Sequence, residues 1–171
     1  MPPEVHFDLS RLDLNRVVAD QEAIARVNPQ RFEMAQLTAI VHVDVAESLI
    51  IGYKDVGEDE FWVRGHMPSY PLLPGVLMCE AAAQLCAYYM GTNGLKLGDF
   101  IGFGGMENVR FRGAVKPGDR LVLVAKGKDL RSRRSIFDVQ GFVGETMVFH
   151  GNIIGMPITI RAAVLGTGVE A

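Results

Sequence analysis

The chain lacks a long apolar run, an excess of basic residues and more than a pair of cysteines. It has 171 residues, a net charge of −3 and no stretch near the roughly 18 consecutive apolar residues of a membrane-spanning helix. It also lacks the basic stripe that nucleic-acid binding requires. Acidic residues within the first 15 positions argue against a secretion signal. We therefore expect a soluble, cytoplasmic protein with no membrane span and no nucleic-acid partner.

The scarcity of cysteine limits disulfide and metal chemistry. Cys79 and Cys86 lie seven residues apart in one predicted helix, where side chains two turns apart are separated by about 10 Å. That separation is too large for a disulfide. The sequence has neither the Cys-x-x-Cys spacing nor the neighbouring Cys/His pair that would indicate a zinc site. Both cysteines are predicted to be reduced core residues, and no metal site is expected.

The length and the hydrophobic content of the chain suffice for one folded domain. Hydrophobic residues make up 49% of the chain, and a domain of this length buries roughly 70% of its unfolded surface. One apolar helix is predicted at 76–90. The predicted strands are 37–45, 48–55, 60–64, 101–112, 120–128, 135–143 and 146–154. This pattern predicts an α+β fold, with a curved antiparallel β-sheet wrapped around one long central α-helix.

The expected domain spans residues 1–171 without a linker. Residues 1–28 are expected to form an N-terminal helical extension that ends at Asn28-Pro29. The Gly- and Ala-rich residues 161–171 are expected to be a flexible tail.

The most specific signal lies at residues 65–84, GHMPSYPLLPGVLMCEAAAQ. Its three prolines exclude regular structure before the helix, which can begin only after Pro74. Glu80 and Gln84 are the strongly polar residues of this helix and, being four apart, share one face. A carboxyl group on an apolar helix needs a partner or a proton. His66, on the loop before the helix, is the titratable neighbour that we expect for it.

This string resembles the active-site signature of 3-hydroxyacyl-[acyl-carrier-protein] dehydratases of the FabZ type, which is written as Gly-His-Phe-Pro, then Pro-Gly-Val and Glu-Ala-x-Ala-Gln. The segments 108–111 and 115–119 are similar to that family's second signature, an Arg-Phe strand followed by a Pro-Gly-Asp turn. The resemblance covers roughly residues 29–155.

The resemblance implies the hotdog fold and a homodimer whose active sites are shared between two chains; a trimer of such dimers stays open. It assigns catalysis to His66 of one chain and Glu80 of the other. Gly75 would donate its backbone N–H to the substrate carbonyl, and Gln84 would be a supporting polar group. The implied reaction is dehydration of 3-hydroxyacyl thioesters to trans-2-enoyl thioesters in fatty-acid or related lipid biosynthesis. The implied partner is acyl carrier protein carrying an acyl-phosphopantetheine.

General chemistry gives the same residues the same roles. A neutral His66 imidazole can remove the C2 proton, and Glu80, if burial keeps it protonated, can protonate the departing hydroxyl. The backbone N–H groups of Gly75 and Val76, unpaired at a helix start, can bind the developing enolate oxygen. Elimination needs nothing more, so no metal or organic cofactor is expected.

Basic residues near the second signature and in a later turn have two interpretations. Such clusters are most often solvated turns. The alternative is a docking surface for an acidic carrier protein, steered by local positive potential. The candidate docking residues are Arg110, Arg112, Lys116, Arg131, Arg133 and Arg134.

Departures from the family pattern keep two other functions open. Met67 and Tyr70 replace other residues in the loop, and residues 28–32 only partly match the family's Pro-His-Arg-x-Pro-Phe segment. The chain length of the acyl group is therefore not readable from the sequence. A hotdog acyl thioesterase would also place a carboxylate on the central helix, although it has no clear need for the His66 loop. A non-catalytic acyl-binding or assembly subunit would keep the motif as a scaffold.

Overall fold

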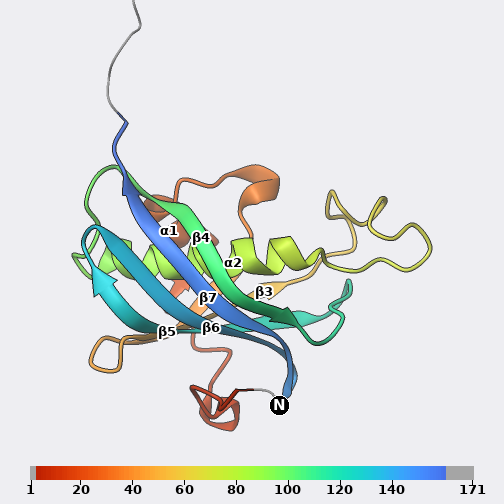
Figure 1. Ribbon diagram of the computed structural model, residues 1–171. Coiled ribbons are helices and arrows are strands. Elements are labelled where there is room, and N and C mark those ends of the chain that lie inside the picture. The colour runs from red at the N-terminus through yellow and green to blue at the C-terminus, as the bar shows by residue number, and fades with distance from the viewer. Residues whose placement is uncertain (1–2, 161–171) are drawn as a thin grey trace, which may run out of the picture.

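The computed structural model describes residues 3–160, and the flexible tail predicted at 161–171 lies outside these described residues. One long helix, α2 (Gly75–Thr92), lies across a seven-stranded antiparallel sheet that curves around it (Figure 1). The order of strands in the sheet is β1-β2-β3-β5-β6-β7-β4. Their bounds are β1 (Ala19–Asp20), β2 (Ala39–Asp44), β3 (Leu49–Asp55), β4 (Phe100–Phe111), β5 (Arg120–Arg131), β6 (Arg134–Val143) and β7 (Thr146–Ile158). The predicted fold class is confirmed.

Burial on nearly all sides holds α2 in place. Residues 76–90 contain neither Gly nor Pro, so nothing interrupts the helix before its last turn. Ala81, Ala82 and Leu85 are fully buried, and the ring of Tyr89 packs edge-to-face on Phe137 of β6, with centroids 5.6 Å apart. Because a helix that is apolar all round is stable only in a core, the sheet wraps it, and Glu80 is left among few polar neighbours.

One predicted strand, residues 60–64, is wrong. This segment forms turns instead, closed by local backbone hydrogen bonds such as Val63 N to Glu60 O at 2.9 Å. The Glu60 carboxylate draws the chain back on itself, since it pairs with Lys54 Nζ at 2.9 Å and accepts from the Trp62 indole at 2.8 Å. The apolar and aromatic residues that favoured a strand are used to bury Trp62 in the core.

Residues 7–14 of the N-terminal segment cover the face of the sheet opposite α2, whereas residues 21–27 pack on the α2 side (Figure 1). Residues 3–27 are helical in η1 (Leu9–Arg11) and α1 (Gln21–Val27), and between these helices the chain pairs with β2 as β1. A second short 3-10 helix, η2 (Phe32–Met34), follows α1. Four apolar side chains of the N-terminal segment pack on a second buried cluster of β2, β3, β5 and β6: Phe7, Leu9, Leu12 and Leu14. The sheet therefore has an apolar core on both faces.

Candidate functional site

The loop of residues 56–74 holds His66 in one orientation. The His66 N–H donates to Trp62 O at 2.8 Å, and its carbonyl accepts from Leu72 N at 2.9 Å. Its ring Nδ1 lies 2.8 Å from Leu72 O. Because a carbonyl oxygen can only accept, Nδ1 carries the hydrogen, and in the neutral ring Nε2 keeps its lone pair. The loop thus presents Nε2 as a potential base.

The start of α2 offers two free backbone donors. The Pro74 carbonyl accepts from Leu77 N at 2.9 Å and from Met78 N at 3.3 Å. Within residues 3–160, the N–H groups of Gly75 and Val76 have no hydrogen-bond partner. A Cβ at position 75 would lie 2.7 Å from the tip of the Phe111 ring, so a larger residue there would require this half-exposed ring of β4 to move. These donors suit a developing negative charge.

Glu80 is held by Gln84, one turn further along α2. The Gln84 amide nitrogen donates to Glu80 Oε1 at 2.8 Å and to Met34 O at 2.6 Å, while its oxygen accepts from Gln36 N at 2.9 Å. Gln84 is 2% exposed, and this network uses both of its donors. Sequence reasoning placed Glu80 and Gln84 on one face, and the structure brings their side chains together.

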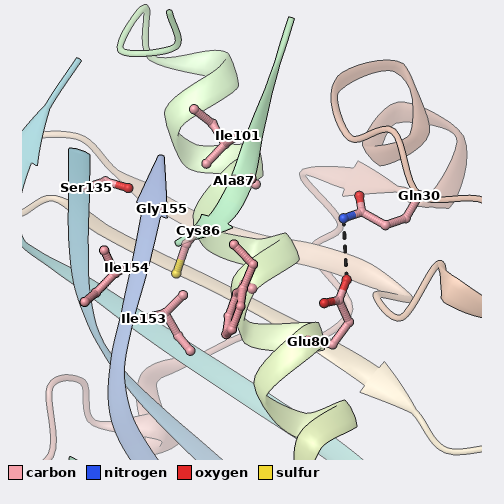
Figure 2. A pocket seen from close by; sticks show the side chains of 12 residues that line it. Gln30, Glu80, Cys86, Ala87, Ile101, Ser135, Ile153, Ile154 and Gly155 are labelled. Atoms are coloured by element: carbon pink, nitrogen blue, oxygen red, sulfur yellow. Dashed lines mark hydrogen bonds between the residues drawn. The ribbon is translucent and has the colours of Figure 1, made fainter. Parts of the chain in front are cut away.

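Sequence reasoning missed Gln30. This residue follows Pro29 and lies opposite Glu80, with its Nε2 3.4 Å from Glu80 Oε1 (Figure 2). The only hint in the sequence was that position 30 falls in the segment that partly matches a family motif. No periodicity connects it with Glu80, because the two residues are 50 positions apart and meet only through the fold.

Glu80 and Gln30 border a small cavity between α2 and the strands β4, β6 and β7. Its volume is about 30 Å³, which is room for one or two water molecules and far below the roughly 300–1,000 Å³ of small-molecule pockets. Apart from Glu80 and Gln30 its lining is largely apolar, as Cys86 and Ile153 illustrate in Figure 2. One chain alone therefore leaves no space here for an acyl group.

His66 and Glu80 do not meet within one chain. The loop that carries His66 lies beyond the amino end of α2 (Figure 1), whereas Glu80 lies within the helix. No residue of the loop lines the cavity at Glu80. Among the described residues, no hydrogen bond or ion pair joins the two side chains.

The predicted docking residues fall into two groups at opposite ends of the sheet. Arg110 on β4 lies beside His150 on β7, which in turn lies beside Gln140 on β6. Gln140 and Arg134 are six residues apart on β6, so Arg110 and Arg134 are separated by about 20 Å along the strands. At the other end, in the hairpin that joins β5 to β6, Arg131 and Arg134 bind Asp129 at 2.8 and 3.3 Å. In one chain these basic residues therefore do not form a single surface.

The group near the His66 loop contacts that loop and strand β7. Lys116 Nζ lies 4.3 Å from the centroid of the Tyr70 ring, which joins it to the loop. Arg112 Nη2 donates to His150 Nε2 at 2.9 Å. Burial, together with the positive charge of Arg112, lowers the pKa of His150, so that imidazole stays neutral and accepts this bond.

Neither the cysteines nor a metal-binding cluster adds chemistry to the site among the described residues. Cys79 and Cys86 are free and buried. Burial raises the pKa of the Cys79 thiol to about 11 and that of Cys86 further, which keeps both protonated. In the part of the chain that the structure describes, no cluster of three or more His, Cys, Asp or Glu side chains could hold a metal ion. No helix among these residues is long and apolar enough to cross a membrane.

A long central helix wrapped by a curved antiparallel sheet, with a His loop before it and a carboxyl group on it, defines a protein of the hotdog class. The family model described as "FabA-like domain" matches residues 28–152, so the chain belongs to the FabA-like family.

Two relatives show how far the similarity extends. The chain is 32% identical over 133 residues to "3-hydroxyacyl-[acyl-carrier-protein] dehydratase FabZ" of Clostridioides difficile, covering 78% of this chain and 93% of that protein. It is 34% identical over 139 residues to the protein of the same name from Moorella thermoacetica, covering 79% and 94%.

Solved structures share the fold at low sequence identity. The dehydratase heterocomplex ApeI:P from Xenorhabdus doucetiae superposes with a TM-score of 0.66 at 16% identity, over 80% of this chain and 91% of that chain. The PaaI protein of Escherichia coli gives a TM-score of 0.53 at 16% identity, over 70% and 78%.

Proposed function

We propose that the chain is a FabZ-type 3-hydroxyacyl-[acyl-carrier-protein] dehydratase. The observation that carries the proposal is that one chain contains an oriented potential base, His66, a carboxyl group held by Gln84, and free N–H groups at Gly75 and Val76. Relatives named for this activity, at 32% and 34% identity and over more than nine-tenths of their length, support it. The substrate class would be 3-hydroxyacyl thioesters, converted to trans-2-enoyl thioesters in fatty-acid or related lipid biosynthesis.

In the proposed mechanism His66 removes the C2 proton. Its Nε2 lone pair is available because Leu72 O fixes the hydrogen on Nδ1. Negative charge then develops on the thioester oxygen, where the N–H groups of Gly75 and Val76 stabilise it. Loss of one such donor typically costs about 10²–10³ in kcat.

Glu80 is the proposed acid. It gives its proton to the C3 hydroxyl as the C3–O bond breaks, so that water leaves and the C2=C3 double bond forms. Gln84 holds the carboxyl group through its Oε1 and leaves Oε2 toward the substrate. The proton taken by His66 is then returned to Glu80 through solvent, which restores the starting state.

A homodimer would bring the acid and the base together. Within residues 3–160 the edge strand β4 pairs with β7 alone, and it exposes the apolar side chains of Phe103 and Met106, at 49% and 47%. A long unpaired edge with apolar side chains favours pairing with another chain. We infer that two chains share each site, with His66 from one and Glu80 from the other.

The proposed carrier-protein partner would dock beside the loop rather than at the distant hairpin. Lys116 and Arg110 lie near the His66 loop and the end of β4. Phosphopantetheine and acidic carrier surfaces are attracted by such positive charge. Two of the three hairpin arginines, Arg131 and Arg134, are already paired with Asp129, which makes this group the weaker candidate.

The test of the proposed function is turnover of 3-hydroxybutyryl thioesters on carrier protein and on coenzyme A. Enoyl absorbance and free thiol are followed together in wild type, His66→Ala and Glu80→Gln. We expect enoyl formation without thiol release, and a loss of at least about 10²-fold in both variants.

Matched controls are His42→Ala and Glu47→Gln, which remove the same groups from strand β2 and from the turn after it. These variants should keep wild-type turnover. Thiol release by the wild type would indicate an acyl thioesterase instead. No turnover on either thioester would indicate an acyl-binding or assembly subunit.

A further inference from the structure

The aromatic ring of Phe111 lies against the start of α2. A Cβ at position 75 would be 2.7, 2.8 and 2.9 Å from the Cζ, Cε1 and Cε2 atoms of this ring. Because the three distances are nearly equal, that point lies over the face of the ring, and Gly75 rests on the face. Phe111 ends β4 and belongs to the second sequence signature, to which the proposed mechanism gives no role. The two signatures of the sequence therefore meet at this contact.

The surroundings of Phe111 hold its ring beside the helix start. Leu73 N donates to Val115 O at 2.8 Å, which ties the residues before Gly75 to those after Phe111. Phe149, which is fully buried, packs on Phe111 with ring centroids 6.2 Å apart. Phe111 nevertheless stays 50% exposed. Half of the ring surface is thus available to a molecule bound at the helix start.

An oxygen that accepts from the Gly75 N–H has to lie beside this ring. In a helical residue the N–H and Cα–Cβ bonds are nearly eclipsed, so such an oxygen is about 3.6 Å from the Cβ position. The ring is 2.7 Å from the same position, and the oxygen is therefore at most about 6 Å from the ring. A thioester group is large enough to fill that space, and its planar shape suits contact with an aromatic face.

We propose that Phe111 is a substrate-contacting residue of the oxyanion site. This inference rests on the proposed dehydratase function. The thioester lies against the exposed half of the Phe111 ring while its oxygen accepts from the N–H groups of Gly75 and Val76. The contact buries apolar surface of the ring, which favours binding. It also keeps water from one side of the donors, and hydrogen bonds to a developing charge are stronger in a site that excludes water.

The first part of the test measures affinity in the absence of turnover. In the full-length chain carrying His66→Ala, calorimetry gives the affinity for butyryl-pantetheine, a thioester without a 3-hydroxyl group. Adding Phe111→Ala should weaken binding about tenfold, because it removes the apolar contact. Phe7→Ala, the same change on the opposite face of the sheet, should leave the affinity unchanged.

The second part reports contact, because a merely structural ring could also lower the affinity when it is removed. Phe111→Trp in the same background places a fluorescent ring at the site. The natural Trp62 is 4% exposed, and its emission is measured in the chain without the added tryptophan. Saturating butyryl-pantetheine should shift the emission of the new indole to shorter wavelength, with a midpoint at the calorimetric Kd. Phe7→Trp should show no shift that depends on the ligand.

The outcomes separate this inference from the proposed function. Weaker binding by Phe111→Ala without an emission shift in Phe111→Trp would assign the ring a merely structural role and overturn the inference. So would an unchanged affinity in Phe111→Ala, or failure of the His66→Ala chain to bind the thioester. If the wild type forms the enoyl product in any of these cases, the dehydratase stands and the inference alone fails. Both signals at Phe111, in a chain whose wild type shows no turnover, would support the contact and reject the dehydratase.

Discussion

At the scale of single residues, one buried amide connects three parts of the site. Gln84 binds Glu80 on its own helix, the carbonyl of Met34 in η2 and the N–H of Gln36 just after it. The helix that carries the acid is thereby tied to the segment that carries Gln30. The amide has one orientation that satisfies all three partners, because a backbone N–H can only donate and a carbonyl can only accept.

Replacing Gln84 by Met should reduce both stability and activity. The substitution leaves the buried Gln36 N–H unpaired, which costs about 1–3 kcal/mol of unfolding free energy, and removes the donor that positions Glu80. Chemical denaturation at constant m-value measures the first effect. Gln21→Met, at an exposed position whose amide makes only a long 3.5 Å bond to Leu37 O, should change stability by less than about 0.5 kcal/mol. An equal loss in both variants would show that the network contributes nothing.

The site could be predicted from sequence only where its residues follow one another in the chain. Glu80 and Gln84 are four apart on a helix, so periodicity alone placed them together. Gln30 meets Glu80 through the packing of α1 and η2 on α2, and no local pattern encodes that contact. The same limit applied to Arg110 and Arg134, whose separation depends on sheet register rather than on spacing.

At the scale of elements, patterning predicted α2 and the strands β2 to β7, because burial on one or both faces leaves a periodic signature. The two-residue β1 is too short to leave one. The failure at residues 60–64 has a specific cause. A charged pair, Lys54 with Glu60, folds the segment into turns, and Lys54 is only 6% exposed. The β-propensity of the aromatic residues favoured a strand, but the tertiary contact between Lys54 and Glu60 stabilises turns instead.

The N-terminal segment is attached to β6 through Asp138. The ring Nε2 of His6 lies 3.3 Å from Asp138 Oδ1, and Gln140 holds the backbone of the same segment at both Glu4 O and His6 N. Burial would raise the pKa of the Asp138 carboxyl, but His6 and the Lys128 ammonium outweigh it and hold that pKa below its usual range. An aspartate with a lowered pKa stabilises the folded state above its ordinary range near 3.9.

Asp138→Asn should therefore cost stability in a pH-dependent way. We expect a loss of about 1 kcal/mol from pH 5 upward, which shrinks as the pH falls through the range where the wild-type carboxyl takes up its proton. Urea midpoints at several pH values measure the difference. Asp59→Asn, at an exposed position without a described partner, should show no such trend; a loss at Asp138 that does not vary with pH would contradict the ion-pair explanation.

At the scale of the whole molecule, a single chain is incomplete for the proposed reaction. The proposed base, His66, lies on a loop beyond the amino end of α2, and the proposed acid, Glu80, borders a cavity of about 30 Å³. The edge strand β4 exposes apolar side chains. A second copy docked along β4 would supply what each chain lacks. Because a two-fold interface is self-complementary, pairing two chains would create two equivalent sites.

This arrangement predicts that two inactive variants restore each other. His66→Ala and Glu80→Gln each lack one half of every site in their own homodimers. When they are mixed in equal amounts and allowed to exchange chains, about half of the dimers become mixed, and each mixed dimer has one intact site of two, which gives about a quarter of wild-type turnover. Steady-state enoyl formation before and after exchange measures the recovery. Replacing Met106, an exposed residue of β4 outside the cavity, by Glu in both variants should abolish it by separating the chains at β4. If His66 and Glu80 of the same chain act together, every mixed dimer contains only broken sites, and the mixture stays as inactive as its components.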